Sequence, residues 1–284
     1  MSPHRYFRNA PIYFFVFSAI FVLAAFAYGQ SSAARPAVDA SAALGSRTAK
    51  NGFKNEDEIA AKFNNWKTDG DAQSWLTAMG YPISDLRSVL ASKPHGEKAD
   101  VEVRIETGSK TKTEGISIKL VSSPNGFNQI DKRWLSHYTK MWNMPLSVEN
   151  PLKRFLGEIA PTKPGRAVNR MFLDELEPLE REAVVAFFTT KKPTIVSDLL
   201  QGDGTHAAGW VMVAFKATPN TRWTLRPIDD VVKYYSEGPV TITSGGNLKI
   251  GRITMQRKGG DGGRDTAKML QFKINPALLL YSEK

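Results

Sequence analysis

The stretch Ala99-Asp-Val-Glu-Val-Arg-Ile-Glu106 alternates apolar and polar residues, and Gly115-Ile-Ser-Ile-Lys-Leu-Val121 repeats this alternation. A period of two is typical of a β-strand that is buried on one face. The residues between the two stretches are rich in Gly, Ser and Lys, so we expect a β-hairpin. Asp100 then heads the first strand on its polar side, and Ser117 and Lys119 share the polar side of the second strand. The hairpin therefore predicts one surface that carries a carboxylate, a hydroxyl and an ammonium group.

A carboxylate and an ammonium group on one sheet surface suit metal-assisted attack on a phosphodiester. Asp100 offers the kind of oxygen ligand that Mg²⁺ prefers, and Lys119 supplies a cation for water or phosphate. An Asp and a Lys on neighbouring strands are also the pattern of an ordinary solvated ion pair. Spacing alone leaves both interpretations open.

The composition indicates a folded, basic chain. Its 284 residues are 42% hydrophobic, which is enough for a sizeable core in one large domain or two smaller ones. The formal net charge is +10, and residues 1–44 contribute only +2 of it through three arginines and one aspartate. Positive charge spread over a domain favours a polyanionic partner, although a basic but otherwise ordinary protein has the same charge.

Two residue types limit the chemistry. Cysteine is absent, which excludes disulfides, thiolate metal sites and Cys nucleophiles. The four histidines lie in different neighbourhoods and have no zinc-binding spacing.

Four blocks of sequence extend the pattern beyond the hairpin. They are GSRTAKNGFKNE at 45–56, IKLVS at 118–122, GFNQIDK at 126–132 and MQRKGGDGGRDTAKMLQFK at 255–273. Together with the strands that carry Asp100 and Lys119, these blocks resemble the PD-(D/E)-x-K nuclease core. More narrowly, they are similar to type II restriction endonucleases of the HinP type, which recognise GCGC. The blocks run in the family's order from about residue 45 to the C-terminus, and they are more specific than a three-residue motif.

The resemblance implies an α/β fold with a restriction-endonuclease-like PD-(D/E)-x-K core, in which helices flank a mixed β-sheet over residues 45–284. It implies a sequence-specific, Mg²⁺-dependent endonuclease that cuts double-stranded DNA to 5′-phosphate and 3′-hydroxyl ends. Asp100, Ser117 and Lys119 take the catalytic positions, and Asp100 holds the metal. Glu56 takes the position of an additional metal-binding carboxylate, in a helix that we expect Asn55 to cap. A cognate DNA methyltransferase is the implied functional partner.

The chain departs from the family pattern at two residues near this chemistry. Ala99 replaces the usual Pro or Ser before the aspartate, which affects the turn and not the charge. Ser117 stands where the family has Glu, Asp or Gln, and a neutral hydroxyl is a poorer Mg²⁺ ligand than a carboxylate. Two alternatives follow: Glu56 compensates, or the chain is a catalytically weakened DNA-binding homologue.

Residues 122–129 predict a loop that contacts DNA after the strand of Lys119. The amides of Asn128 and Gln129 are suited to reading base edges, and Phe127 to wedging against a base step. An alternative is that Phe127 packs under the loop and the two amides cap the following helix. The residues alone favour both interpretations equally. The resemblance favours DNA contact.

A glycine-rich segment near the C-terminus predicts a second DNA contact. Glycines let the backbone approach a phosphate, and Arg or Lys can pair with guanine, as Asp can with cytosine. The residues concerned are Arg257, Lys258, Asp261 and Arg264. A Walker A phosphate loop is excluded because Gly263 is followed by Arg264 and not by Lys, whereas a merely flexible hairpin remains an alternative.

Further elements follow from the periodicity. We expect helices over 55–66, 71–79, 132–142, 173–189 and 228–235, strands over 210–216, 222–226 and 248–255, and a loop-rich passage over 145–164. A palindromic DNA site favours a homodimer, but some enzymes cut as monomers.

Residues 1–44 have the pattern of an export signal or a membrane anchor. A positively charged start precedes the apolar run over 11–28, and small residues and an Ala-rich stretch follow. A restriction enzyme acts where the chromosome is, so this leader conflicts with the body of the chain. Initiation at Val38 would remove the conflict and predicts a cytoplasmic protein. Otherwise the chain is exported or is anchored to the inner membrane through residues 11–28.

Overall fold

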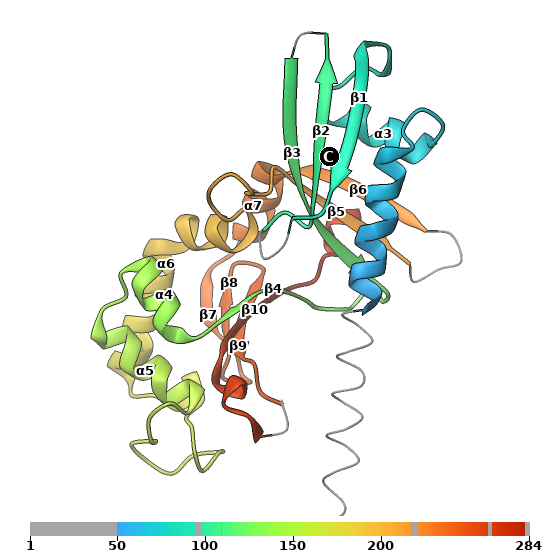
Figure 1. Cartoon of the computed structure of the whole chain (residues 1–284). Coiled ribbons are helices and arrows are strands. Elements are labelled where there is room, and N and C mark those ends of the chain that lie inside the picture. The colour runs from blue at the N-terminus through green and yellow to red at the C-terminus, as the bar shows by residue number, and fades with distance from the viewer. Residues whose placement is uncertain (1–49, 95–97, 109, 217–220, 261–262, 282–284) are drawn as a thin grey trace, which may run out of the picture.

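The computed structural model describes residues 50–94, 98–108, 110–216, 221–260 and 263–281, and every structural statement below refers to them. Two five-stranded sheets and the helices around them make up this part of the chain (Figure 1). The leader at 1–44, His95 and Asp261 lie outside the described residues.

The first sheet contains the predicted hairpin. Its strands, in spatial order, are β1 (Leu86–Ser92), β2 (Val101–Thr107), β3 (Lys110–Val121), β5 (Trp210–Phe215) and β6 (Arg222–Pro227). The β3–β5 pair is parallel and the other pairs are antiparallel, so the sheet is mixed. Burial alternates along β2 as predicted, with Val101, Val103 and Ile105 facing the core. The expectation of a mixed sheet flanked by helices is confirmed.

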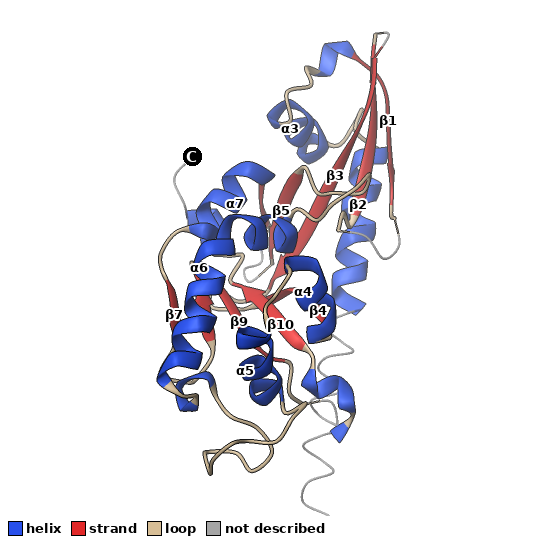
Figure 2. Ribbon diagram, turned by 90° about the vertical axis from the view of Figure 1, so that its left-hand side faces the viewer, coloured by secondary structure: helices blue, strands red, loops and turns tan. Residues whose placement is uncertain are grey.

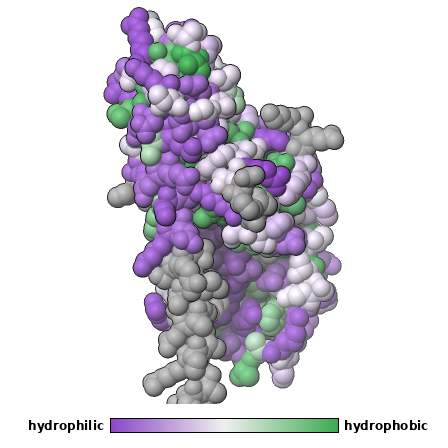
Figure 3. All heavy atoms as spheres, turned by 90° about the vertical axis from the view of Figure 1, so that its right-hand side faces the viewer, coloured by the Kyte–Doolittle hydropathy of each residue, from purple (hydrophilic) through white to green (hydrophobic). Residues whose placement is uncertain are grey.

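The second sheet is antiparallel throughout. Its strands, in spatial order, are β4 (Asn128–Arg133), β10 (Leu270–Ile274), β9 (Ile253–Arg257), β8 (Leu248–Ile250) and β7 (Val240–Ile242). One face of the sheet packs against α4 (Leu135–Trp142), α5 (Leu146–Leu156) and α6 (Pro178–Leu200), as Figures 1 and 2 show. From the opposite side, the lower part of the molecule has a recess in which purple, hydrophilic residues lie beside white and green ones (Figure 3).

Two hydrophobic clusters meet at the first sheet. One cluster joins Val211 and Val213 of β5 to buried residues of α4, α5 and α6. The other joins Met212 of β5 to buried residues of the helix over 50–64 and of α3 (Gly70–Ala78). Strand β5 is therefore buried on both faces, which explains its unbroken apolar sequence. The remaining elements are α7 (Ile228–Ser236), α8 (Leu278–Tyr281) and the 3₁₀ turns Ile83–Asp85, Leu173–Glu175 and Asp265–Lys268.

The N-terminal helix differs from the prediction in its start. Residues 50–54 are already helical, so Asn55 lies inside the helix and is not its cap. Its side chain is buried, and its amide atoms have no hydrogen-bond partner in the described residues. The apolar stripe of Ile59, Phe63 and Trp66 is buried as predicted.

Several further elements differ from the sequence-based prediction. Residues 128–133 are strand β4, so the predicted loop ends before Asn128 and the next helix starts only at Leu135. The passage over 145–164 contains helix α5 although Pro151 lies within it, and α6 extends to Leu200 beyond the predicted end. The predicted strand over 248–255 is two strands that turn at Gly251, where a positive φ of 57° favours glycine.

No helix in the described ranges is long and apolar enough to cross a membrane. The apolar run over 11–28 lies outside those ranges.

Candidate functional site

Asp100 lies directly before β2, where the ladder with β3 ends. Its backbone N–H donates to Ile116 O at 2.9 Å, which anchors the residue to β3. Strand β3 continues past this point, and the N–H of Ile118 donates to Asp100 Oδ2 at 2.5 Å. The carboxylate thus replaces the strand partner that Ile118 would otherwise need.

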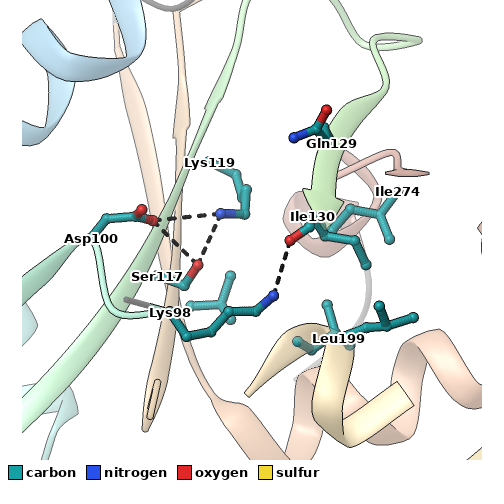
Figure 4. A pocket seen from close by; sticks show the side chains of 10 residues that line it. Lys98, Asp100, Ser117, Lys119, Gln129, Ile130, Leu199 and Ile274 are labelled. Atoms are coloured by element: carbon teal, nitrogen blue, oxygen red, sulfur yellow. Dashed lines mark hydrogen bonds and ion pairs between the residues drawn. The ribbon is translucent and has the colours of Figure 1, made fainter. Parts of the chain in front are cut away.

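Ser117 and Lys119 project from β3 toward Asp100. The Ser117 hydroxyl donates to Asp100 Oδ2 at 3.3 Å, and Lys119 Nζ donates to Ser117 Oγ at 2.9 Å and to Ile118 O at 3.1 Å. Lys119 Nζ lies 3.5 Å from Asp100 Oδ2. The hairpin therefore brings a carboxylate, a hydroxyl and an ammonium group together, as its parity predicted (Figure 4).

These side chains line a cavity of about 170 Å³ between the two sheets. Its other walls come from β4, β5, β10 and the end of α6, and include Gln129, Ile130 and Leu199 (Figure 4). The wall formed by Lys98, Asp100, Ser117 and Lys119 is polar, and the facing wall is apolar except for Gln129 (Figure 4).

Lys98 is a second cation in this cavity, and the sequence analysis missed it. Its ammonium donates to Ile130 O at 3.0 Å and lies 3.4 Å from Asp131 Oδ2. Burial lowers the pKa of Lys98, and Lys119 lowers it further, while Asp131 opposes both effects. Its position two residues before Asp100 is the only sequence signal that could have pointed to it.

Glu56 faces the same region from the N-terminal helix. Its carboxylate lies 3.2 Å from Lys93 Nζ. Burial raises the pKa of Glu56, the negative charge of Asp100 raises it further, and Lys93 and Lys119 oppose this. Glu56 and Asp100 are therefore close enough to repel each other.

The donor set is compatible with a hard divalent cation but is poor in acids. Oxygen atoms from Asp100, Ser117 and the Ile118 carbonyl converge, and a cation would relieve the repulsion between Asp100 and Glu56. Within the described residues, no three His, Cys, Asp or Glu side chains form a metal-binding group.

The three residues of the predicted DNA-contacting loop lie in three different environments. Phe127 is 54% exposed, with Lys249 Nζ at 5.7 Å from its ring centroid. The Asn128 amide donates to Leu120 O at 2.9 Å, so it fixes the loop to β3. Gln129 is exposed on β4 and also lines the cavity.

The glycine-rich segment is not brought into the cavity. Arg257 lies on the helix-covered side of β9, where its Nε donates to Leu156 O at 2.8 Å, and burial lowers its pKa. Lys258 is half-buried, and its backbone N–H donates to Met269 O. Arg264 is exposed directly before a 3₁₀ turn. Asp261 lies outside the described residues.

A comparison with protein families gives a match over residues 79–280 to the model of the R.HinP1I restriction endonuclease. The chain belongs to this family. It is therefore a type II site-specific deoxyribonuclease. No curated protein matches its sequence.

The fold agrees with this membership. The chain is similar to the crystal structure of the restriction endonuclease MspI in complex with its cognate DNA, with a TM-score of 0.52 and 12% sequence identity. The similarity covers 77% of this chain and 83% of that chain. At this identity the comparison shows the fold alone.

Most residues assigned to the site lie inside the segment that matches the R.HinP1I family. Asp100, Ser117, Lys119, Gln129 and the glycine-rich segment all fall within 79–280, whereas Glu56 precedes it. The role of Glu56 therefore rests on its place in the fold and not on the family match.

Proposed function

We propose that this chain is a Mg²⁺-dependent restriction endonuclease that recognises GCGC in double-stranded DNA. The observation that carries the proposal is the convergence of Asp100, Ser117 and Lys119 at one end of the cavity. Family membership supports DNA as the substrate. GCGC comes from the resemblance of the sequence blocks to the HinP type.

In this proposal Asp100 and Glu56 hold the cation. When bound, Mg²⁺ would neutralise charge on the scissile phosphate. The carboxylate of Asp100 is already oriented, because the N–H of Ile118 and the hydroxyl of Ser117 both donate to it.

Lys119 positions the attacking water as an ammonium group, or accepts a proton from it as a neutral amine. Its ammonium is held by Ser117 Oγ and Ile118 O, so it stays directed toward Asp100. The water oxygen forms the new bond to phosphorus, and the bond to the 3′-oxygen breaks. The 3′-oxygen then takes up a proton, which gives the 5′-phosphate and 3′-hydroxyl ends.

The proposed DNA-binding residues are Phe127, Asn128, Gln129, Arg257, Lys258, Asp261 and Arg264. The exposure of Phe127 and the position of Gln129 at the cavity support the first group. Asn128 acts by holding the loop, since its amide is bonded to Leu120 O. Arg257 needs to leave Leu156 O before its Nε can donate to DNA.

Ser117 favours a second candidate function, a DNA-binding homologue with weakened cleavage. The side chain is 3% exposed, and its hydroxyl already contacts Asp100 and Lys119. A buried neutral oxygen at this place contributes less to cation binding than a carboxylate does.

A Mg²⁺-dependent digest of plasmid DNA with mapped GCGC sites separates the two candidates. Discrete fragments with ends at GCGC support the proposed enzyme. A mobility shift without fragments, over a range of Mg²⁺ concentrations, supports the binding homologue. Fragments with ends at another sequence would contradict the GCGC assignment while leaving the nuclease assignment in place.

The cellular setting belongs to the same proposal. We propose that residues 45–284 form the endonuclease unit and that a cognate DNA methyltransferase protects the host. A homodimer suits a palindromic site. The protein is cytoplasmic if the leader is absent from the native chain, and otherwise exported or anchored to the inner membrane through residues 11–28. The intact mass of the native protein distinguishes these.

A further inference from the structure

The face of the second sheet opposite its helices carries polar side chains in two rows, and we call it the polar face. The strand register aligns Lys249, Thr254, Lys273 and Gln129 in one row, and Gln256, Gln271 and Lys132 in the other. Neither row contains an acidic residue. This arrangement is suited to contact with a polyanion.

A chain of amide hydrogen bonds crosses the polar face. Gln256 Nε2 donates to Gln271 Oε1 at 3.3 Å, and Gln271 Nε2 donates to Gln129 Oε1 at 2.6 Å. Gln271 is only 7% exposed, whereas Gln129 is exposed and lines the cavity. The chain therefore runs from a buried side chain to one that can touch a ligand.

The link from Gln271 to Gln129 is not the one that strand register alone would give. Gln271 is paired with Lys132 across β10 and β4, and Gln129 is paired with Lys273 in the other row. The Gln271 amide thus reaches diagonally, across an irregularity in the β4–β10 ladder between Phe272 and Lys273. The contact joins the two rows of the polar face.

This contact fixes what Gln129 offers to its surroundings. Because its carbonyl oxygen accepts from Gln271, its NH₂ group remains to donate. A carboxamide that presents only its NH₂ group selects an acceptor on a base edge, such as guanine O6 or N7, and rejects the amino group of cytosine. A carboxamide that is free to flip can instead donate to an acceptor on the base or accept from an amino group.

We propose that Gln271 is a positioning residue for base recognition, which holds the Gln129 carboxamide with its NH₂ group toward the DNA. The proposal rests on the proposed function, because it deepens the DNA recognition assigned to Gln129. Gln271 acts through Gln129 and does not itself contact the base.

The test compares cleavage of the preferred duplex with cleavage of duplexes that differ from it by one base pair. Gln271→Met keeps the length of the side chain and removes both amide bonds, and Gln129→Met removes the proposed reader. Specificity at each base pair is kcat/KM on the preferred duplex divided by kcat/KM on the duplex altered at that base pair. We expect each variant to lower this ratio at the same single base pair, by roughly five- to tenfold. The double variant should lose no more than the larger single effect, since the two residues act as one unit.

The outcomes separate this inference from the proposed function. If the wild-type protein shows no sequence preference, both the proposed function and the positioning role of Gln271 are overturned. A specific wild-type protein whose Gln271→Met variant keeps every ratio, or loses activity equally on all duplexes, overturns the positioning role alone. If Gln271→Met does not fold, Gln256→Met replaces it, because this less buried residue supplies the bond that orients Gln271. A smaller loss at the same position is then expected, and an unchanged ratio overturns the inference.

Discussion

Ser117→Asp replaces the hydroxyl between Asp100 and Lys119 by a second carboxylate. Ser117 Oγ lies 3.3 Å from Asp100 Oδ2 and 2.9 Å from Lys119 Nζ. Two carboxylates at a separation near 4 Å repel each other by about 4 kcal/mol at an effective dielectric constant of 20. Attraction to Lys119 at a similar distance offsets this repulsion, but burying another charge at a position that is only 3% exposed costs several kcal/mol more. We expect the variant to lose about 1–3 kcal/mol of stability at neutral pH without divalent cations.

Thermal unfolding in EDTA and in Mg²⁺ measures this effect. A loss of 1 kcal/mol lowers Tm by about 2–4 °C in a domain of this size. Mg²⁺ at a hundred times its Kd returns about 2.7 kcal/mol. The variant should therefore melt several degrees below the wild type in EDTA and recover in Mg²⁺, with cleavage at least equal to wild type.

Ser117→Asn is the matched control, because it has a similar size and adds no charge. It should show no Mg²⁺-dependent gain beyond that of the wild type. Equal Tm values of Ser117→Asp and the wild type in EDTA would contradict the electrostatic cost of a second carboxylate. The same Mg²⁺ response in the Asp and Asn variants would refute the assignment of a cation site beside Asp100.

Three other predictions concern the pKa of Glu56, the turn at Gly251 and the polar face. Because the pKa of Glu56 is raised above its ordinary 4.5, its contribution to stability is present below that pH and is lost as pH rises through the raised pKa. Glu56→Gln should therefore gain stability relative to wild type as pH rises above 4.5, as measured by denaturant titration. Gly251→Ala should cost about 1–3 kcal/mol in the same assay, because its Cβ would lie 2.5 Å from Tyr235 O at a φ of 57°. Lys249→Ala should reduce the slope of log K for DNA binding against log salt by about 0.9.

Each of these predictions has its own control or contrary result. A stability difference between Glu56→Gln and wild type that does not change with pH contradicts the raised pKa. Gly52→Ala, which meets no atom within 4 Å, should not destabilise the protein, and an equal loss at Gly251 and Gly52 contradicts the steric account of the turn. Lys192→Ala on α6 should leave the salt slope of DNA binding unchanged. If Lys249→Ala also leaves this slope unchanged, DNA does not contact the polar face.

The hairpin could be predicted from the sequence because its information is local. Alternation along β2 indicates which of its side chains are buried. The pairing of Val101 with Ile116 was not predicted, because β3 begins at Lys110, inside the stretch expected to connect the two strands. The same alternation placed Ser117 and Lys119 on the side of Asp100. Strand β5 was equally clear, since six consecutive apolar residues precede Lys216.

The second sheet could not be predicted in this way. Strands β7 and β8 have three residues each, too few to establish a period. Lys98 enters the cavity because its ammonium reaches Ile130 on β4, and Gln271 matters because of a diagonal contact with Gln129. Such contacts join segments that are distant in sequence, so local sequence patterns cannot predict them. The Asn55 cap was wrong because the helix already includes residues 50–54.

Lys119→Ala tests the central claim most directly, namely that the cavity beside Asp100 cuts DNA. Single-turnover cleavage of a GCGC duplex in Mg²⁺ and equilibrium binding of the same duplex should be measured on one preparation. The account predicts that cleavage falls by at least about 100-fold while Kd changes little, since the lost ammonium is held by Ser117 and Ile118 inside the cavity. Unchanged cleavage, or an equal loss of cleavage and binding, would contradict it.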